Sequence, residues 1–139
     1  MTLKFLLDTS IVSAPIAKQP NRRVITRLDQ HGLHCAIAAP VWHELVYGCG
    51  RLPPGKRRVA LEEYLDTVVR RSFPILAYDE AAAAWHGRER ARLEEIGRPA
   101  PHVDGQIAAI AYSQDITLVT ANVKHFAAFK GLTLADWTR

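Results

Sequence analysis

The sequence predicts an α/β protein with a parallel sheet of four to five strands flanked by helices on both faces. Two observations carry this prediction. Short apolar runs alternate along the chain with longer segments in which apolar residues recur at helical spacing. Several of the apolar runs also end abruptly in a polar residue that can cap the helix that follows. Strands separated throughout by helices favour parallel pairing, because parallel neighbours need a long crossover connection.

Five apolar runs are predicted strands. The first ends in Asp8, and the fifth is expected at an edge of the sheet. The expected ranges are 3–7, 35–38, 73–78, 116–120 and 132–134.

Helix signals fill the gaps between these strands. Asn21 and Asp79 are predicted N-caps, and Pro40 is expected to open a helix. Helices are expected to begin at 22 and 40, to cover 56–71 and 80–96, to begin again at 102, and to cover 122–129. The predicted inward positions are Val24, Ile25, Leu28, Val59, Leu65, Val68, Val69, Ala82, Trp85, Leu93, Ile96, Ile107, Ala108, Ile110 and Ala111.

The composition fits one soluble domain. The chain has 139 residues, 48% of them hydrophobic and 23% charged, which excludes disordered, collagen-like and coiled-coil classes. No repeat or linker divides it, so we expect a single domain over 1–139. The formal charge of +4 is only a mild hint of a polyanionic partner.

The location expected from the sequence is cytoplasmic. Cys35 and Cys49 match no metal-binding spacing and are interpreted as reduced thiols. The apolar stretch before Asp8 is too short for a signal peptide, and no run has the length of a membrane span.

Polar residues follow the predicted strands at one edge of the sheet. Asp8 comes directly after the first strand, Glu44 lies early in the helix after the second, Asp104 opens a helix, and Asn122 follows the fourth strand. Ligands of open parallel sheets bind beyond the carboxyl ends of the strands, so these residues are expected to meet in space.

Acidic residues gathered in this way predict a site for a hard divalent cation. Three carboxylates repel one another unless a cation compensates them. Mg²⁺ prefers oxygen ligands, whereas zinc would want the His or Cys residues that this edge lacks, so Mg²⁺ or Mn²⁺ is predicted. Such an ion suits phosphodiester hydrolysis. Singly, Asp8 and Asp104 are better explained as helix N-terminal acids and Glu44 as a solvated residue, and only their conjunction favours the site.

Four stretches together resemble the VapC-type PIN-domain toxins over nearly the whole chain. They are Leu6-Leu7-Asp8-Thr9-Ser10, Val41 to Gly48, Asp104 to Ala109, and Val119 to Phe126. The resemblance implies a Rossmann-like fold, Mg²⁺-dependent endoribonuclease activity on RNA, inhibition by a cognate VapB-type antitoxin of a type II toxin–antitoxin pair, and homodimers.

The resemblance also implies roles at the site. Asp8 and Asp104 correspond to direct metal ligands, and Glu44 to a residue that holds a metal-bound water or a second ion. Thr9 or Ser10 corresponds to the family's small hydroxyl residue. Many relatives have a fourth acid where this chain has Asn122, whose amide offers a carbonyl ligand with one less negative charge.

Several weaker signals also have ordinary surface or core explanations. Lys124 lies near the predicted edge and is a candidate for substrate binding, and Thr120 is a candidate for orienting water. His43, His102 and His125 are each more typical of packing or polar surface residues. The tryptophans are interpreted as core or interface anchors. Four basic clusters are mostly interpreted as solvated helix faces, although any of them offers the residues that phosphate contacts need: Arg22-Arg23, Lys56-Arg57-Arg58, Arg70-Arg71 and Arg88-Arg90-Arg92.

Alternative functions remain open at this point. A zinc peptidase would need His where Tyr47 stands, and an aspartate-nucleophile phosphatase would need a second Asp where Ser10 stands. A phospho-receiver would need paired acids near its N-terminus. The alternative from a different class is a non-catalytic RNA-binding or partner-binding module on the same fold, against which the retained acids argue.

Overall fold

A five-stranded parallel sheet forms the centre of the molecule, as predicted. The computed structural model describes residues 2–139. The strands have the order β3-β2-β1-β4-β5, and all neighbours pair in parallel. Their bounds are β1 Phe5–Leu7, β2 Cys35–Ala38, β3 Ile75–Leu76, β4 Thr117–Val119 and β5 Leu134–Ala135.

The strand order creates a switch point between β1 and β4. From β1 the chain moves outward to β2 and β3, and it then returns to the other side of β1 to form β4 and β5. Leu7 of β1 is paired with Ile37 on one side and with Val119 on the other. The carboxyl ends of β1 and β4 therefore lie side by side at the place where doubly wound sheets bind ligands.

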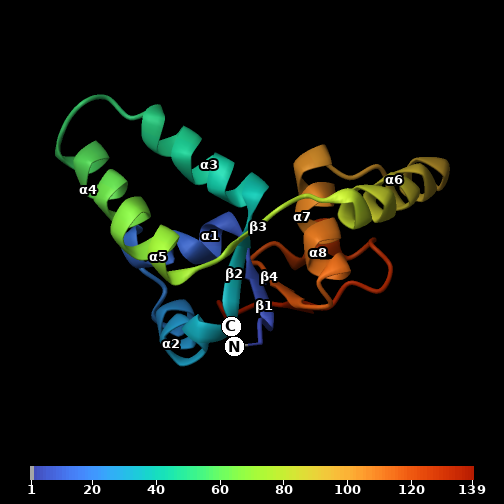
Figure 1. Ribbon diagram of the computed structural model, residues 1–139, viewed down its shortest axis with the longest axis horizontal. Coiled ribbons are helices and arrows are strands. Elements are labelled where there is room, and N and C mark those ends of the chain that lie inside the picture. The colour runs from blue at the N-terminus through green and yellow to red at the C-terminus, as the bar shows by residue number, and fades with distance from the viewer. Residues whose placement is uncertain (1) are drawn as a thin grey trace.

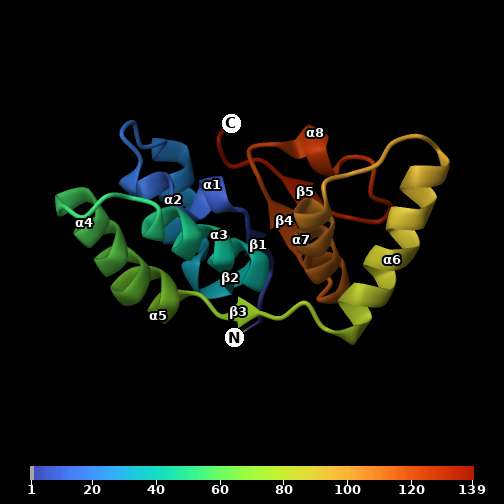
Figure 2. The ribbon, with the colours of Figure 1, turned by 90° about the horizontal axis from the view of Figure 1, so that it is seen from above.

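Helices cover both faces of this sheet, which confirms the predicted fold class. Figure 2 shows α2, α4 and α5 on one side of the strands and α6 and α7 on the other, and Figure 1 labels the elements along the chain. The bounds are α1 Thr9–Val12, α2 Arg22–His31, α3 Ala39–Gly50, α4 Lys56–Tyr64, α5 Arg70–Ser72, α6 Glu80–Glu95, α7 His102–Ser113 and α8 Val123–Phe126, with short 3₁₀ turns at Ala14–Ile16 and Gly32–His34 and a π-helix at Leu65–Val69.

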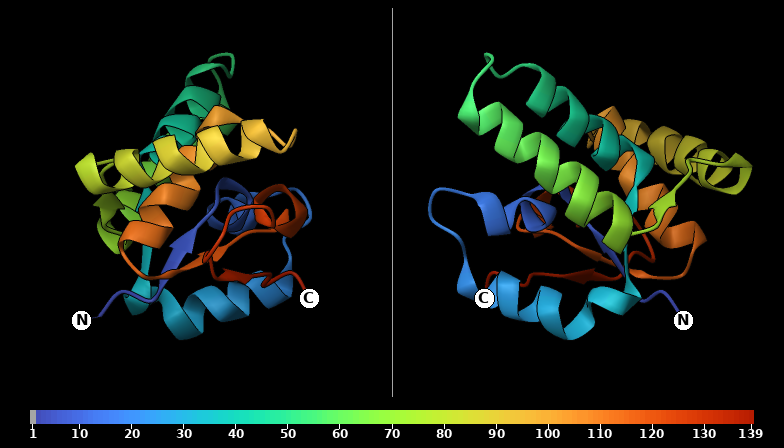
Figure 3. Two further views of the ribbon diagram at one scale, coloured as in Figure 1. Left: turned by 90° about the vertical axis from the view of Figure 1, so that its right-hand side faces the viewer. Right: turned by 60° about the vertical axis from the view of Figure 1, so that its left-hand side comes forward.

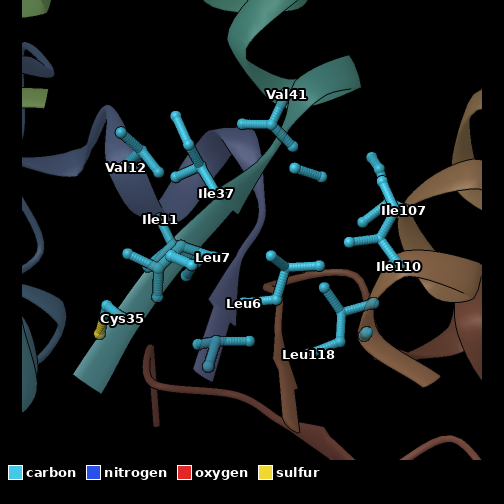
Figure 4. Close-up of a cluster of buried hydrophobic side chains, with 14 of the residues drawn as sticks. Leu6, Leu7, Ile11, Val12, Cys35, Ile37, Val41, Ile107, Ile110 and Leu118 are labelled. Atoms are coloured by element: carbon cyan, nitrogen blue, oxygen red, sulfur yellow. The ribbon is translucent and has the colours of Figure 1, made fainter. Parts of the chain in front are cut away.

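The central strand divides its side chains between the two faces. Leu6 lies with Leu118 and Ile110, whereas Leu7 lies with Ile11 (Figure 4), and all of these side chains are buried. This alternation follows from the two-residue period of a strand. Because both faces of β1 are covered, the strand is apolar throughout and Asp8 is the first polar residue after it.

Three predicted core positions are wrong. Val59, Val68 and Ile96 are 53%, 42% and 53% exposed, respectively. The predicted single helix over 56–71 contains the π-helix Leu65–Val69, whose extra residue per turn changes the phase, so that Leu65 and Val69 point inward and Val68 outward. Val59 lies on the open side of α4, and Ile96 comes after the last turn of α6.

The edges of the sheet are shorter than predicted. The predicted strand over 73–78 pairs only at Ile75–Leu76, and the fifth strand is displaced to Leu134–Ala135. Pro74 has no N–H for the ladder, although its carbonyl accepts a hydrogen bond from Ile37 (3.0 Å). The last helix ends at Phe126 instead of continuing to Phe129.

The two cysteines are free and buried. Within residues 2–139, none of the helices has the length and apolar character needed to cross a bilayer.

Candidate active site

Asp8 is held in a fixed orientation at the carboxyl end of β1. It is the N-cap of α1, and its Oδ1 accepts a hydrogen bond from the backbone N–H of Thr9 (2.8 Å). Its Oδ2 accepts a hydrogen bond from the hydroxyl of Thr120 (2.8 Å), which follows β4. Both oxygens are therefore oriented by donors from two adjacent strand ends, and each keeps lone pairs for a further partner.

Thr120 positions Asp8. The side chain is fully buried, and its Oγ1 accepts the backbone N–H of Asn122 (3.0 Å) while it donates to Asp8. Accepting one hydrogen bond directs the hydroxyl proton into the other. The structure thus shows the Thr120 hydroxyl holding the Asp8 carboxylate, and the predicted role of Thr120 in orienting water stays a prediction.

Asp104 lies near Asp8 and is electrostatically unsatisfied. It occupies the first turn of α7. Burial raises the pKa of its carboxyl above the ordinary value, the neighbouring Asp8 carboxylate raises it further, and His125 lowers it. The imidazole Nδ1 of His125 stands 3.7 Å from Oδ2 of Asp104. The structure therefore brings the two predicted direct ligands, Asp8 and Asp104, within repulsive range of each other.

A close contact between α6 and α7 sets the position of Asp104. The next residue, Gly105, lies against the buried ring of His86, and a Cβ added at Gly105 would fall 2.2 Å from Nε2 of that ring. His86 shares a hydrogen bond with the hydroxyl of Tyr78 through Nδ1 (2.8 Å). Burial lowers the pKa of His86, and His102 lowers it further, which keeps the ring neutral. Only glycine permits this approach of the two helices.

Glu44 stands apart from the two aspartates. It is exposed on α3 and lines a groove together with Thr9, Ser13 and Arg57. Thr9 links this groove to Asp8, so Glu44 faces the same region from the α3 side. Among residues 2–139, no three His, Cys, Asp or Glu side chains gather closely enough to hold a metal ion by themselves.

The remaining predicted residues occupy the rim. Ser10 is exposed, and Thr9 is half-buried with its N–H on Asp8. Asn122 and Lys124 are exposed and line a second groove on the opposite side of the site, together with His125. The Asn122 side chain does not cap α8, although it occupies the N-cap position.

Sequence reasoning gave His125 too little weight. Its contact with Asp104 is the one histidine contact near the two aspartates among the described residues. The available signal was its place in the stretch that follows the fourth strand, because that stretch begins at the same edge as Asp8. Its partner on another helix was not visible in the local pattern.

The two aspartates suit a hard divalent cation. Two partly buried carboxylates that repel each other are stabilised when a cation lies between or beside them. Hard divalent cations are commonly held by one or two carboxylates together with waters and substrate phosphates, so the chemistry of Asp8 and Asp104 is compatible with such an ion. Chemically, such a site can activate water and neutralise charge on a phosphodiester.

The chain is similar to proteins of known family. The PIN domain family model matches residues 5–132. The chain is 34% identical over 136 residues to the tRNA(fMet)-specific endonuclease VapC of Shigella flexneri, covering 98% of this chain and 99% of the relative. It is 33% identical over 135 residues to Toxin FitB of Neisseria gonorrhoeae, covering 95% and 97%. The crystal structure of FitAcB from Neisseria gonorrhoeae superposes with a TM-score of 0.88 at 32% identity, covering 96% of this chain and 97% of that one.

Proposed function

This chain belongs to the PIN-domain family, and from that premise we propose that it is a metal-dependent endoribonuclease, the toxin of a type II toxin–antitoxin pair. The observation that carries the proposal is the pair of aspartates at the switch point of the sheet. Asp8 is oriented by Thr120, and Asp104 is kept near it although the pKa of Asp104 is raised by burial and by Asp8. A fold that had no use for a cation would gain by removing one of these charges.

The metal fits at the two aspartates. PIN-domain nucleases use divalent metal ions, and Mg²⁺, with Mn²⁺ as a substitute, is our assignment for this chain. Asp8 and Asp104 would hold the ion, Glu44 would hold a metal-bound water or a second ion, and the Asn122 amide would supply a neutral oxygen. When bound, the ion supplies the activation of water and the neutralisation of phosphoryl charge.

The protein's own side chains would orient the reaction. The hydrogen bonds from Thr120 and from the Thr9 N–H keep the Asp8 carboxylate in one rotamer, so its free lone pairs face a constant direction. The exposed imidazole of His125 and the exposed ammonium of Lys124 flank Asp104 and Asn122, where they would contact an incoming RNA phosphate. The small hydroxyl residue of the family would be Thr9 or Ser10.

Two further partners belong to the proposal. The relatives include a toxin and a VapC endonuclease, which supports a cognate VapB-type antitoxin that would block the site of this chain. The resemblance to the VapC-type toxins also implies a homodimer. Exposed apolar side chains give such partners a surface to cover: Val46 and Tyr47 on α3, and Val59 and Val68 on the segment that follows.

The decisive experiment is RNA cleavage under controlled metal conditions. The protein, purified free of any inhibitor, should cleave structured RNAs, with tRNA among them, in Mg²⁺ or Mn²⁺ and should be inactive in EDTA. Asp8→Asn should abolish cleavage, whereas Asp66→Asn, which removes an exposed charge away from the site, should leave it unchanged. Cleavage that persists in EDTA would exclude the metal mechanism. RNA binding without cleavage under every metal condition would favour the non-catalytic module instead.

A further inference from the structure

Two grooves of the molecule meet at Arg139. One is the groove beside the active site, whose lining includes Asn122, Lys124, His125, Asp136 and Arg139. The other runs along α2, and Arg139 is also part of its lining. Figure 3 shows in both views that the C-terminal end of the chain lies beside the start of α2. A continuous path therefore leads from the carboxylate of Asp104, past His125, to α2.

The α2 part of this path is strongly basic. Its lining consists of Arg22, Arg23, Arg27 and Arg139, with Thr26 and Gln30 between them. We call the four arginines the basic track. Within residues 2–139, the three α2 arginines form no ion pair, unlike Arg58, Arg90 and Arg92, each of which is bound to a glutamate on its own helix. Their positive charge is therefore uncompensated.

Arg139 lines both grooves, and most of its guanidinium group is open to solvent. Its Nε stands 3.5 Å from Oδ2 of Asp136, and its side chain is 89% exposed. The Asp136 carboxylate is itself occupied, since its Oδ1 accepts the backbone N–H of Thr138 at 2.9 Å. Asp136 thus anchors the base of Arg139 and leaves the rest of the guanidinium open for another anion.

The arginines of α2 do not stabilise the helix on which they lie. Arg22 and Arg23 occupy the first turn of α2, which contains no acidic residue, and the positive end of the helix dipole disfavours cations there. Arg23 and Arg27 are one turn apart on the same face, where like charges destabilise a helix. Residues that violate local rules without a structural benefit point to a function.

The lining of the track selects the class of ligand. Protein interfaces are anchored by Trp and Tyr as well as Arg in well-packed pockets, and the lining of this groove contains only arginine, threonine and glutamine, with no aromatic side chain. Guanidinium groups match the geometry of phosphate oxygens and bind them without reading sequence. A phosphate backbone is the ligand that this surface fits.

We propose that the basic track binds the sugar–phosphate backbone of the RNA substrate and leads it past Lys124 and His125 to the two aspartates. This inference rests on the proposed ribonuclease function and adds to it the direction from which the RNA reaches the site. The groove beside Glu44, on the other side of the aspartates, is not part of this path.

The test is RNA binding over a series of salt concentrations, in EDTA so that cleavage does not interfere. The probe is a fluorescein-labelled single-stranded RNA of mixed sequence, and the variant is Arg23→Gln/Arg27→Gln. We expect affinity to fall about tenfold and the slope of log K against log salt to become shallower by roughly 1.4, about 0.7 for each phosphate that the variant no longer neutralises. Because both arginines are exposed and unfavourable to α2, thermal stability should be unchanged or slightly higher.

The matched control is Arg88→Gln/Arg98→Gln, which removes the same charge from exposed positions on and after α6, across the sheet from α2. This control should keep the wild-type affinity within about twofold and leave the slope nearly unchanged, because it lowers the net charge by the same amount at positions outside the basic track. Equal losses in both variants would overturn the track, because the effect would then come from net charge.

Cleavage kinetics separate this proposal from the proposed function. If the protein is an active nuclease, the α2 variant should raise KM about tenfold and leave kcat nearly unchanged, since phosphate contacts far from the reacting bond bind both states equally. An active enzyme with an unchanged KM and unchanged binding would overturn the track and leave the ribonuclease function intact. Binding of poly-glutamate that disappears in the variant while RNA binding is kept would assign the track to an acidic protein and overturn the proposal.

Discussion

Asp104 and Glu89 are carboxylates on helices that pack against each other, but they differ in the hydrogen-bond donors around them and in the direction of their pKa shifts. Glu89 of α6 is buried and accepts two hydrogen bonds from the guanidinium of Arg92, both 2.8 Å, and one from the N–H of Lys130 at 2.9 Å. The hydrogen bond from Arg92 is the main cause that lowers the pKa of Glu89, against the opposing effect of burial. Arg92 also donates to the carbonyl of Ala128 (2.8 Å), so the group ties α6 to the segment after α8.

Asp104 of α7 has no comparable set of donors. Burial and the Asp8 carboxylate raise the pKa of Asp104, and its only basic neighbour in the described part of the chain is the imidazole of His125, 3.7 Å away. The same fold that compensates Glu89 fully leaves Asp104 uncompensated a short distance along the neighbouring helix. A carboxylate with a raised pKa beside a second carboxylate in an open crevice is a mark of a functional site. The contrast therefore separates an acid that stabilises the fold from an acid kept for a ligand.

The variant Asp104→Asn should show the largest effect. Losing one of the two proposed metal ligands should lower kcat by roughly a thousandfold. The same change removes a half-buried charge that Asp8 repels, so the free energy of unfolding in EDTA should rise by roughly 1 kcal/mol. Cleavage assays and thermal denaturation in EDTA measure the two effects. Unchanged activity would remove Asp104 from the site, and a loss of stability would mean that its carboxylate has a structural role like that of Glu89.

The variant Glu89→Gln should show the reverse pattern. It leaves the half-buried guanidinium of Arg92 without its counter-charge, and we expect a loss of roughly 2 kcal/mol in the free energy of unfolding, measured by urea denaturation. The kcat of the folded fraction should stay close to that of the wild type. The matched control is Glu94→Gln, whose ion pair with Arg90 is exposed at 3.4 Å and should contribute under about 0.5 kcal/mol. Equal effects in the two variants would contradict the structural role of Glu89.

The pH dependence of stability in EDTA should separate the same two residues. The folded-state pKa of Glu89 is lowered, so its contribution is present above the unfolded-state pKa and is lost as pH falls through the folded-state value. The folded-state pKa of Asp104 is raised, so its penalty is present at neutral pH and disappears as pH falls through that raised value. As the pH is lowered from 7 toward 4, the midpoint of Asp104→Asn should approach that of the wild type from above. The midpoint of Glu89→Gln should approach it from below, and only at lower pH. Parallel curves for variants and wild type would contradict both assignments.

The sequence predicted the placement of the two aspartates because that placement is local and topological. An apolar run that ends in Asp8 makes a strand followed by a helix cap, and a proline-rich break before His102 starts the helix that carries Asp104. The parallel order then brings both to one edge of the sheet. No long-range packing detail is needed for that result.

Other features depend on contacts that no local pattern contains. The pairing of His125 with Asp104 joins α8 to α7, and the seating of His86 against Gly105 joins α6 to α7. The outward turn of Val68 follows from a π-helix that the spacing of apolar residues does not reveal. Glu44 was expected among the aspartates, but it lies exposed on α3 in a groove that it shares with Thr9, and its role stays a prediction.

Thr120 offers the smallest and most specific test of the comparison, because it supports Asp8 in the way that Arg92 supports Glu89 but without a charge. Thr120→Val keeps the shape of the side chain and removes the hydroxyl, which leaves Oδ2 of Asp8 without its donor and the N–H of Asn122 without its acceptor. We expect a loss of about 1 kcal/mol in stability and a fall in kcat of about tenfold. Thr120→Ser keeps the hydroxyl and should restore most of the activity.

A positioning role for Thr120 also predicts a change in the metal dependence. If the hydroxyl fixes the rotamer of a metal ligand, Thr120→Val should raise the Mg²⁺ concentration at half-maximal activity, and Thr120→Ser should return it toward the wild-type value, as orienting partners of metal ligands commonly affect affinity by about tenfold or more. A variant that loses stability but keeps its Mg²⁺ dependence would show that Thr120 merely fills the end of β4. In that case the orientation of Asp8 would depend on the N–H of Thr9 alone, and Thr120 would not support Asp8 in the way that Arg92 supports Glu89.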